Sequence, residues 1–178
     1  MKIVILQGSP NLRGSTAILV EEFARGAREA GREVERIDVA RSDVRSCTGC
    51  VACGYGARPC AQRDGMASVL EKLLAADMVV FATPVYYFSM TAQLKAVVDR
   101  FCSENVRITA KRLKAALLAV AWNGDAETFA PLEVHYDAIC RYLDLRDCGR
   151  VIGRGCGTPS MTRASDYPHA AYELGRSL

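Results

Sequence analysis

The chain has 178 residues, of which 50% are hydrophobic and 24% are charged, and its formal net charge is only +3. This composition is typical of a soluble globular protein, and no apolar run approaches the ~20 residues of a membrane span. Basic residues are spread along the chain without a run, so nucleic-acid binding is not indicated either.

The length predicts one domain over residues 1–178, large enough to bury a substantial core. The opening apolar run, residues 1–6, is cut short by Gly8 and Pro10, too soon for a signal peptide, so we expect a cytoplasmic protein. In that setting the eight cysteines are expected to serve metal or redox chemistry as thiols instead of forming a disulfide scaffold.

The loop over residues 8–16 is rich in Gly and hydroxyl side chains and joins a predicted strand, which ends at Gln7, to a predicted helix over residues 15–30. The first turn of that helix leaves free N–H groups and a positive dipole end, which suit an anion. The loop has neither the Lys of a Walker A motif nor Gly-x-Gly-x-x-Gly spacing, so it favours a terminal monophosphate such as that of FMN. The expected phosphate contacts are Ser9, Asn11, Gly14, Ser15 and Thr16. The alternative is a turn whose Ser and Thr merely cap the helix.

Residues 33–39 alternate polar and apolar side chains, as a strand near the edge of a sheet does. Residues 41–65 lose this periodicity and contain four cysteines, so we expect a loop with a chemical role. A second amphipathic helix is predicted between Met66 and Leu74. The apolar run over residues 77–83 then predicts a buried parallel strand that ends at Pro84.

Residues 84–90 are rich in aromatic side chains and lead into a helix that Thr91 is expected to cap and that extends to Phe101. A flat apolar surface beside a phosphate-binding turn suits a flavin ring, which needs burial of one face and hydrogen bonds along its pyrimidine edge. The expected ring contacts are Pro84, Val85, Tyr86, Tyr87 and Phe88. The alternative is that these aromatic residues belong to the core or to a dimer contact.

We interpret residues 104–114 as a polar connector. The apolar run over residues 115–122 repeats the signature of a buried strand and stops at a third polar loop, Asn123-Gly124-Asp125. A helix over residues 129–143 and a short strand over residues 148–152 complete the pattern. Strands and helices that alternate in this way predict an α/β fold with a parallel sheet, whose ligands bind beyond the carboxyl ends of the strands.

Three motifs occur together in the first two thirds of the chain. They are residues 8–16, then Cys47-Thr48-Gly49-Cys50-Val51-Ala52-Cys53, and then Thr83-Pro84-Val85-Tyr86-Tyr87 with Leu94-Lys95 and Asp99-Arg100-Phe101. As a set they resemble the NAD(P)H-dependent FMN reductase family of flavodoxin-like fold and, more narrowly, its iron–sulfur flavoprotein branch.

The resemblance implies a flavodoxin-like three-layer sandwich with a five-stranded parallel sheet in the order 2-1-3-4-5. It also implies FMN at the carboxyl edge of that sheet, and a homodimer or homotetramer in which the flavin lies near a subunit interface. Asn123, Gly124 and Asp125 are expected to contact the cofactor, an assignment that rests on their position alone.

The four cysteines of the loop are spaced as Cys47-x2-Cys50-x2-Cys53-x6-Cys60. They supply the four thiolates that a [4Fe–4S] cluster requires, and the last gap fits the iron–sulfur flavoproteins that the chain resembles. Zinc is a less natural occupant, because structural zinc usually takes two separated cysteine pairs. The alternative is a set of free thiols or a redox-active pair such as Cys47 and Cys50.

Other charged and thiol groups receive simpler interpretations. Arg45, Arg58 and Arg63 bracket the four cysteines, where their charge would favour thiolates; the alternative is that they are only solvated loop charges. We expect the four thiols to lie close enough to the flavin for redox communication. Cys102 and Cys140 lie on predicted helical stretches and are interpreted as packing residues.

The chain is therefore predicted to be an FMN-dependent oxidoreductase that takes hydride from NAD(P)H and reduces a small acceptor such as a quinone. Flavin chemistry needs no nucleophilic triad, so we expect no catalytic side chain, and His135 and His169 are interpreted as structural. One alternative is an iron–sulfur electron carrier fed by a ferredoxin. Another is a non-catalytic nucleotide- or phosphate-binding sensor on the same fold.

Overall fold

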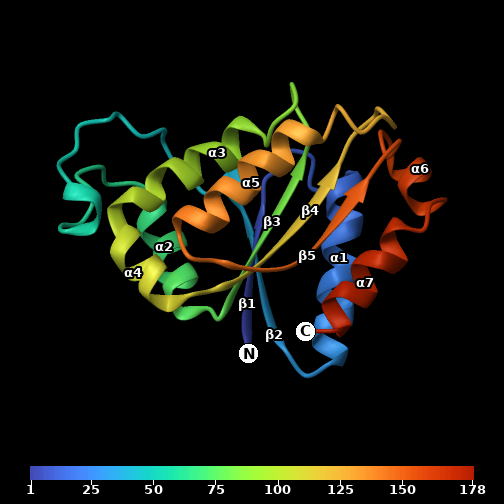
Figure 1. The fold of residues 1–178 in the computed structure, drawn as a ribbon, viewed down its shortest axis with the longest axis horizontal. Helices are drawn as coiled ribbons and strands as arrows, with labels where there is room; N and C mark the ends of the chain where they lie inside the picture. Colours follow the sequence, from blue (N-terminus) through green and yellow to red (C-terminus); the bar gives the residue numbers. More distant parts are fainter.

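The computed structural model describes residues 1–178 and contains one sheet of five parallel strands in the order β2-β1-β3-β4-β5 (Figure 1). The α/β class and the predicted strand order are therefore confirmed. The strand order reverses at β1 and β3, and sheets of this kind bind ligands beyond the carboxyl ends of the strands at such a point. The strands are β1 Lys2–Gln7, β2 Glu33–Asp38, β3 Met78–Pro84, β4 Lys114–Val120 and β5 Arg146–Gly153.

Helices cover both faces of the sheet, which confirms the three-layer sandwich (Figure 1). One face carries α1 (Ser15–Glu29) and α7 (Tyr167–Arg176), with the short α6 (Pro159–Arg163) leading into α7. The other face carries α2 (Met66–Ala75), α3 (Ala92–Asp99), α4 (Asn105–Lys111) and α5 (Ala130–Tyr142). Three short 3-10 turns, η1 (Val39–Arg41), η2 (Gly54–Gly56) and η3 (Arg100–Glu104), complete the chain. None of these helices combines the length and the apolar character needed to cross a bilayer.

The central strands β3 and β4 are buried along almost their whole length, as their continuous apolar runs predict. Successive strand side chains point to opposite faces, so Val79 and Phe81 pack toward α2, α3 and α5, whereas Val80 and Ala82 pack toward α1. The edge strand β2 is only partly buried, which agrees with its alternating pattern.

Helices α1 and α7 approach each other closely because each presents a glycine to the other. A Cβ atom on Gly26 would lie 2.1 Å from the backbone oxygen of Tyr172, and a Cβ atom on Gly175 would lie 2.1 Å from that of Phe23. The sequence analysis assigned no element beyond residue 152, so this helix pair is a finding of the structure.

The prediction of a polar connector over residues 104–114 is wrong. This segment contains the end of η3, helix α4 and the start of β4. The only core side chains that it contributes are Ile108 and Leu113, and α4 has only seven residues. A helix this short shows too little of the 3.6-residue repeat to be detected from hydrophobic spacing.

Candidate functional site

A cavity of about 280 Å³ lies at the carboxyl edge of the sheet, beyond the ends of β1, β3, β4 and β5. It brings together two of the predicted sets: all five expected phosphate contacts, and three of the five expected ring contacts, Pro84, Val85 and Tyr86. The predicted convergence of these loops is therefore found in the structure. The remaining walls come from Val120, Ala121, Trp122, Cys156 and Gly157.

The loop after β1 holds its shape through its own hydrogen bonds. The backbone N–H of Asn11 donates to Ser9 Oγ over 3.2 Å, and Asn11 Oδ1 accepts from the backbone N–H of Arg13 over 3.1 Å. The N–H of Gly14 donates to the backbone oxygen of Asn11 over 3.1 Å. The turn is therefore organised before any ligand binds.

Ser15 begins α1 and carries the clearest sign of a missing ligand. Its Oγ is buried and has no hydrogen-bond partner, although buried hydroxyl groups almost always have one. The preceding cap residue, Gly14, has no side chain that could satisfy the free N–H groups of the first helical turn. These donors fit the phosphate of a mononucleotide such as FMN.

The loops after β1 and β3 are tied together by Thr91. Its hydroxyl donates to the backbone oxygen of Gly8 over 2.7 Å and accepts from the N–H of Leu94 over 3.3 Å. The N–H of Thr91 donates in turn to Thr83 Oγ1 over 3.1 Å. The predicted cap of α3 is confirmed, and the same residue fixes the spacing between the phosphate turn and the aromatic loop.

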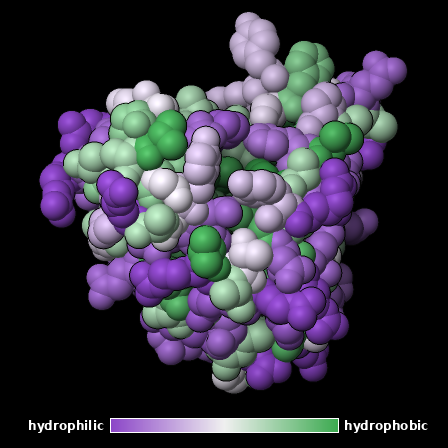
Figure 2. Space-filling view, turned by 60° about the vertical axis from the view of Figure 1, so that its left-hand side comes forward, coloured by the Kyte–Doolittle hydropathy of each residue, from purple (hydrophilic) through white to green (hydrophobic).

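The aromatic loop ends in a tight two-residue turn that stands above the sheet between β3 and α3 (Figure 1). Tyr86 and Ser89 exchange backbone hydrogen bonds of 2.9 and 3.2 Å, and Tyr87 and Phe88 between them have φ values of 44° and 67°. Tyr87 is 98% exposed, and hydrophobic and pale side chains project at this end of the molecule in the space-filling view (Figure 2).

A second cavity of about 170 Å³ adjoins the first and shares Val85, Ala121 and Trp122 with it. Tyr87, Phe88 and Asn123 line this second cavity. Gly124 and Asp125 line neither cavity. Asp125 instead accepts hydrogen bonds of 2.9 Å from both the N–H and the hydroxyl of Thr128, which holds the loop after β4.

Sequence reasoning missed the wall that follows β5. Cys156 is buried in the first cavity, and Gly157 lies so close to the indole of Trp122 that a Cβ atom on it would be 2.2 Å from Cε3. The signal was present, because residues 154–157 follow a predicted strand and contain two glycines. The rule that ligands bind at the carboxyl edge applies to this loop as well.

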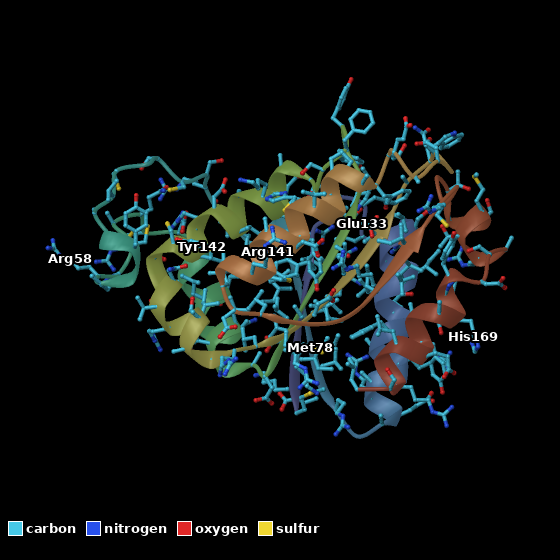
Figure 3. All side chains as sticks on the ribbon, viewed as in Figure 1. Arg58, Met78, Glu133, Arg141, Tyr142 and His169 are labelled. Atoms are coloured by element: carbon cyan, nitrogen blue, oxygen red, sulfur yellow. The ribbon has the colours of Figure 1, made fainter.

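The two histidines lie outside this cavity. His135 is on α5, where its Nδ1 is 3.5 Å from Ser89 Oγ below the aromatic turn, and burial lowers its pKa. His169 stacks on Tyr172 on the exposed side of α7, at the opposite side of the molecule from the cysteine loop (Figure 3).

The cysteine loop, residues 44–62, is closed at its base by a buried ion pair. Arg100 Nη1 lies 2.8 Å from Asp64 Oδ2 and donates to the backbone oxygen of Arg45 over 2.9 Å, and both charged side chains are only 1% exposed. The carboxylate of Asp64 also accepts from the N–H of Arg45 over 3.1 Å. One buried pair therefore joins the two ends of the loop to η3.

A cavity of about 100 Å³ inside this loop is lined by the four predicted ligands, Cys47, Cys50, Cys53 and Cys60. A fifth thiol, that of Cys102 on η3, lines it too. The interpretation of Cys102 as a packing residue did not include this position beside the four predicted ligands. Its position could not be inferred because it is far from the motif in sequence.

Arg100 gives this cavity a positive wall. Its guanidinium lies beside the Cys60 thiol, and its buried Nε has no hydrogen-bond partner. A four-thiolate cluster is an anion, so the donor set and the buried cation fit a [4Fe–4S] cluster. No group of three or more side chains is gathered closely enough to hold a single metal ion. This finding does not test the cluster, because the four thiolates of a [4Fe–4S] cluster bind four different irons. The cluster therefore remains a prediction.

The charges around the thiols differ from those expected. The N–H of Ala52, the hydroxyl of Thr48 and the guanidinium of Arg100 lower the pKa of Cys50. Arg45 donates to the backbone oxygen of Arg63, and Arg58 lies at the outer tip of the loop (Figure 3). Arg100 is thus the arginine that faces the thiols, although its place in the sequence did not indicate this.

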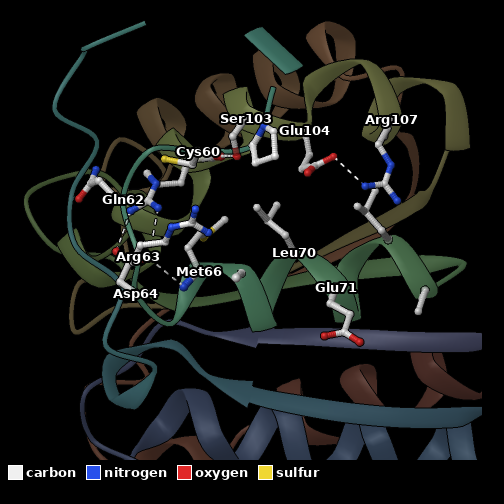
Figure 4. A pocket seen from close by; sticks show the side chains of 15 residues that line it. Cys60, Gln62, Arg63, Asp64, Met66, Leu70, Glu71, Ser103, Glu104 and Arg107 are labelled. Carbon is white, nitrogen blue, oxygen red and sulfur yellow. Dashed lines mark hydrogen bonds and ion pairs between the residues drawn. The ribbon is translucent and has the colours of Figure 1, made fainter. Parts of the chain in front are cut away.

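The largest cavity, about 610 Å³, lies on the other side of the loop base, between α2, η3 and α4 (Figure 4). It shares Cys60, Gln62 and Arg100 with the cysteine cavity. The FMN-type cavity and the cysteine cavity share no lining residue. Closeness of the thiols to the flavin therefore stays a prediction.

Solved structures support the fold. An NAD(P)H:quinone oxidoreductase from Methanothermobacter marburgensis has a TM-score of 0.73 at 20% identity, over 99% of this chain and 95% of that chain. An FMN-dependent NADH-azoreductase from Bacillus anthracis, solved in complex with FMN, has a TM-score of 0.75 at 14% identity, over 99% of this chain and 98% of that one.

Sequence comparisons identify the family more specifically than these structures do. An iron-sulfur flavoprotein of Archaeoglobus fulgidus is 36% identical over 119 residues, which are 67% of this chain and 57% of the relative. The chain spans about half the length of the curated relatives that it matches best. The model of the family described as NADPH-dependent FMN reductase matches residues 1–145. The chain therefore belongs to the NADPH-dependent FMN reductase family, as its motifs predicted.

Proposed function

We propose that the chain is an FMN-dependent oxidoreductase that takes a hydride from NAD(P)H and reduces a small two-electron acceptor such as a quinone. The observation that carries the proposal is the buried, unpartnered Ser15 Oγ at an uncapped helix start, inside a cavity that continues onto an aromatic surface. Family membership makes FMN the expected occupant.

Each wall of the cavity has a separate task in this proposal. Ser9, Asn11, Ser15 and Thr16 bind the phosphate, and Thr91 holds their turn at a fixed distance from the loop after β3. Tyr86 and Trp122 orient the flavin ring and exclude water from it. Bound FMN supplies the hydride chemistry, so no side chain has to act as nucleophile or base.

An anaerobic assay tests this function. The full chain loaded with FMN should oxidise only about one equivalent of NADPH or NADH without an acceptor, as the bound flavin is reduced, and should turn over continuously when a quinone is present. A Ser9→Ala/Ser15→Ala/Thr16→Ala variant should bind FMN at least about 100-fold more weakly, because each hydrogen bond to a charged group contributes about 1.5 to 3 kcal/mol. Ser177→Ala, which removes a hydroxyl at the end of α7, is the matched control. FMN binding without turnover would favour the sensor function.

A second candidate is an electron carrier that holds a [4Fe–4S] cluster and receives single electrons from a ferredoxin-type donor. It is favoured by the four thiols of one cavity beside the buried Arg100, and by the iron-sulfur flavoprotein relatives. Cys47, Cys50, Cys53 and Cys60 would hold the cluster, which supplies one-electron transfer when bound. Anaerobic reconstitution should then give four irons and four sulfides per chain, and Cys50→Ala should lose them. Iron-free protein that binds FMN normally would reject this candidate.

We also propose a cytoplasmic homodimer or homotetramer. Tyr87 and Phe88 are exposed at 98% and 53% on a rigid turn beside the cavity, where apolar side chains are unusual unless they are covered by a partner. Light scattering of wild-type protein should give a mass of at least two chains. Replacement of both residues by Ser should shift that mass toward one chain, and an unchanged mass would place the interface elsewhere.

A further inference from the structure

The cysteine cavity contains one thiol more than a four-iron cluster can use. Cys47, Cys50, Cys53 and Cys60 come from the loop, whereas Cys102 comes from η3, which belongs to the helical layer. The cysteine loop and the helical layer therefore both contribute thiols to this cavity. The extra thiol has no role in the proposed flavin chemistry or in a four-thiolate ligand set.

Cys53 is the loop thiol that is best placed to react with Cys102. Both thiols line the same small cavity, and Cys53 is buried directly before η2. Its backbone oxygen accepts from the N–H groups of Gly56 and Arg58 over 3.2 and 2.9 Å, so its position is fixed. Cys47 lines this cavity as well, but it is exposed, and its sulfur accepts from the N–H of Gly49 over 3.5 Å.

The backbones of the two elements are direct neighbours, which is the first requirement for a bridge between them. Turn η2 packs directly against η3 and α4. A Cβ atom on Gly56 would lie 3.1 Å from the backbone nitrogens of Asn105 and Val106, which shows that the two segments touch. A disulfide needs its two Cα atoms within ~7 Å, and only neighbouring backbones satisfy that condition.

We propose that Cys53 and Cys102 form a disulfide when the cluster-free chain meets a peroxide. The peroxide transfers one oxygen to the Cys53 sulfur, giving a sulfenic acid and releasing water from hydrogen peroxide. The Cys102 sulfur then displaces the hydroxyl group as a second water, so two thiols lose two protons and two electrons in total. Disulfides that form within reducing compartments are usually transient and redox-sensing, which suits this chemistry.

The disulfide would also affect the second candidate function, the binding of a [4Fe–4S] cluster. Only this effect rests on that proposed function; the disulfide itself does not. Cys53 cannot bind iron while it is bonded to Cys102, so oxidation would prevent cluster assembly until a reductant restores the thiol. Cys102 would then determine whether the loop accepts a cluster, although it is not one of the four predicted ligands.

Peptide mapping tests the bridge without using any enzymatic activity. The full-length, cluster-free, FMN-loaded chain is treated anaerobically with one equivalent of hydrogen peroxide, and remaining thiols are blocked before trypsin digestion without reductant. Trypsin does not cut the Arg58–Pro59 bond, so Cys53 lies in the tryptic peptide 46–63, and the Cys47→Ala/Cys50→Ala/Cys60→Ala variant leaves it as the only thiol there. Arg107 ends the peptide that starts at residue 101 and contains Cys102. We expect these two peptides to be linked, and to separate on addition of dithiothreitol.

Cys102→Ala should abolish the link, whereas Cys148→Ala on β5 should leave it intact. FMN binding, which uses the other cavity, checks that each variant is folded. Absence of the 53–102 link in folded protein would overturn the proposal. In wild-type protein, a link of Cys102 to Cys47 or of Cys47 to Cys50 as the main product would overturn it as well.

Iron uptake tests the consequence separately. Wild-type protein oxidised in this way should take up at least about 10-fold less iron than reduced protein until dithiothreitol is added. Cys102→Ala protein, oxidised identically, should take up iron as fast as its reduced form. Equal uptake by oxidised and reduced wild-type protein would show that the disulfide does not prevent cluster assembly. The existence of the disulfide itself would still be decided by the peptide map. Failure of the reduced protein to bind any iron would reject the second candidate function instead.

Discussion

The two candidate sites of this protein are built in different ways. The FMN-type cavity lies where four parallel strands end, so hydrogen bonds of the sheet fix the relative positions of its walls. The cysteine cavity lies within a loop that contains only one short 3-10 turn, and the Arg100–Asp64 pair closes its base. The first site therefore depends on strand register, whereas the second depends on one buried pair of charges.

This difference has a consequence for mutation. A substitution that removes the buried charge pair should release the cysteine loop and leave the FMN-type cavity intact. A substitution at the carboxyl edge of the sheet should disturb the FMN-type cavity and leave the cysteine loop intact. The predictions below use this separation, beginning with the largest expected effect.

Arg100→Met should be the most destabilising of the substitutions considered. It leaves the carboxylate of Asp64 buried without a counter-charge, which costs about 3 to 5 kcal/mol of unfolding free energy. Chemical denaturation measures the loss, and the FMN affinity of the folded fraction should not change. Arg107→Met, which removes an exposed partner of Glu104, is the control and should have a much smaller effect. Equal losses in the two variants would show that the buried pair does not support the loop.

Gly157→Ala should disturb the FMN-type cavity and not the cysteine loop. The new Cβ would lie 2.2 Å from Trp122 Cε3, so the indole, which lines the FMN-type cavity, must move. FMN affinity, followed by quenching of flavin fluorescence, should fall, while the reactivity of the loop cysteines toward a thiol reagent should stay the same. Gly124→Ala meets no atom within 4 Å and should behave as the wild type. Unchanged FMN affinity in the Gly157 variant would place the flavin away from this wall.

Acid should weaken the base of the cysteine loop in a defined pH range. The Arg100 guanidinium lowers the pKa of Asp64 from 3.8 to about 2. A carboxyl group with a lower pKa in the folded state contributes stability above its unfolded pKa and loses it as the pH falls through the folded pKa. The wild type should therefore lose about 2 kcal/mol more than Asp64→Asn between pH 5 and pH 2. Parallel stability curves for the two proteins would contradict this assignment.

The aromatic turn should show the smallest effect, and in the opposite direction. Phe88 has a φ of 67°, a left-handed conformation that costs a residue with a Cβ atom about 1 kcal/mol or more. Phe88→Gly should therefore melt about 2 to 4 °C higher than Phe88→Ala, which removes the same ring but keeps the Cβ atom. Equal melting temperatures for the Gly and Ala variants would show that the turn carries no backbone strain.

The contrast between the two sites also explains what the sequence could predict. All five residues through which the loop after β1 and the start of α1 line the FMN-type cavity were predicted, because they are close together in sequence and their strand–loop–helix context is local. The order of the sheet followed from alternating elements together with family resemblance. Cys156 and Gly157 were missed although the same rule about carboxyl ends applies to the loop after β5.

The cysteine cavity was predicted only in part, because two of its walls come from distant residues. Neither Arg100 nor Cys102 belongs to the cysteine motif, and hydrophobic spacing gives no reason to place them beside it. Arg100 did leave a signal, since it lies next to Phe101 in a stretch where buried residues recur. A charged residue in such a stretch indicates a buried ion pair, but its partner Asp64 cannot be identified without the fold.

The central claim, that the phosphate of FMN binds at the start of α1, is tested most directly by comparing FMN with riboflavin, which lacks the phosphate. Ser15→Ala should weaken FMN binding by about 10- to 100-fold, because one hydrogen bond to a charged group is lost. The same substitution should leave riboflavin binding unchanged, as measured by titration of flavin fluorescence. Equal effects on the two flavins, or no effect on FMN, would contradict the assignment of this turn to the phosphate.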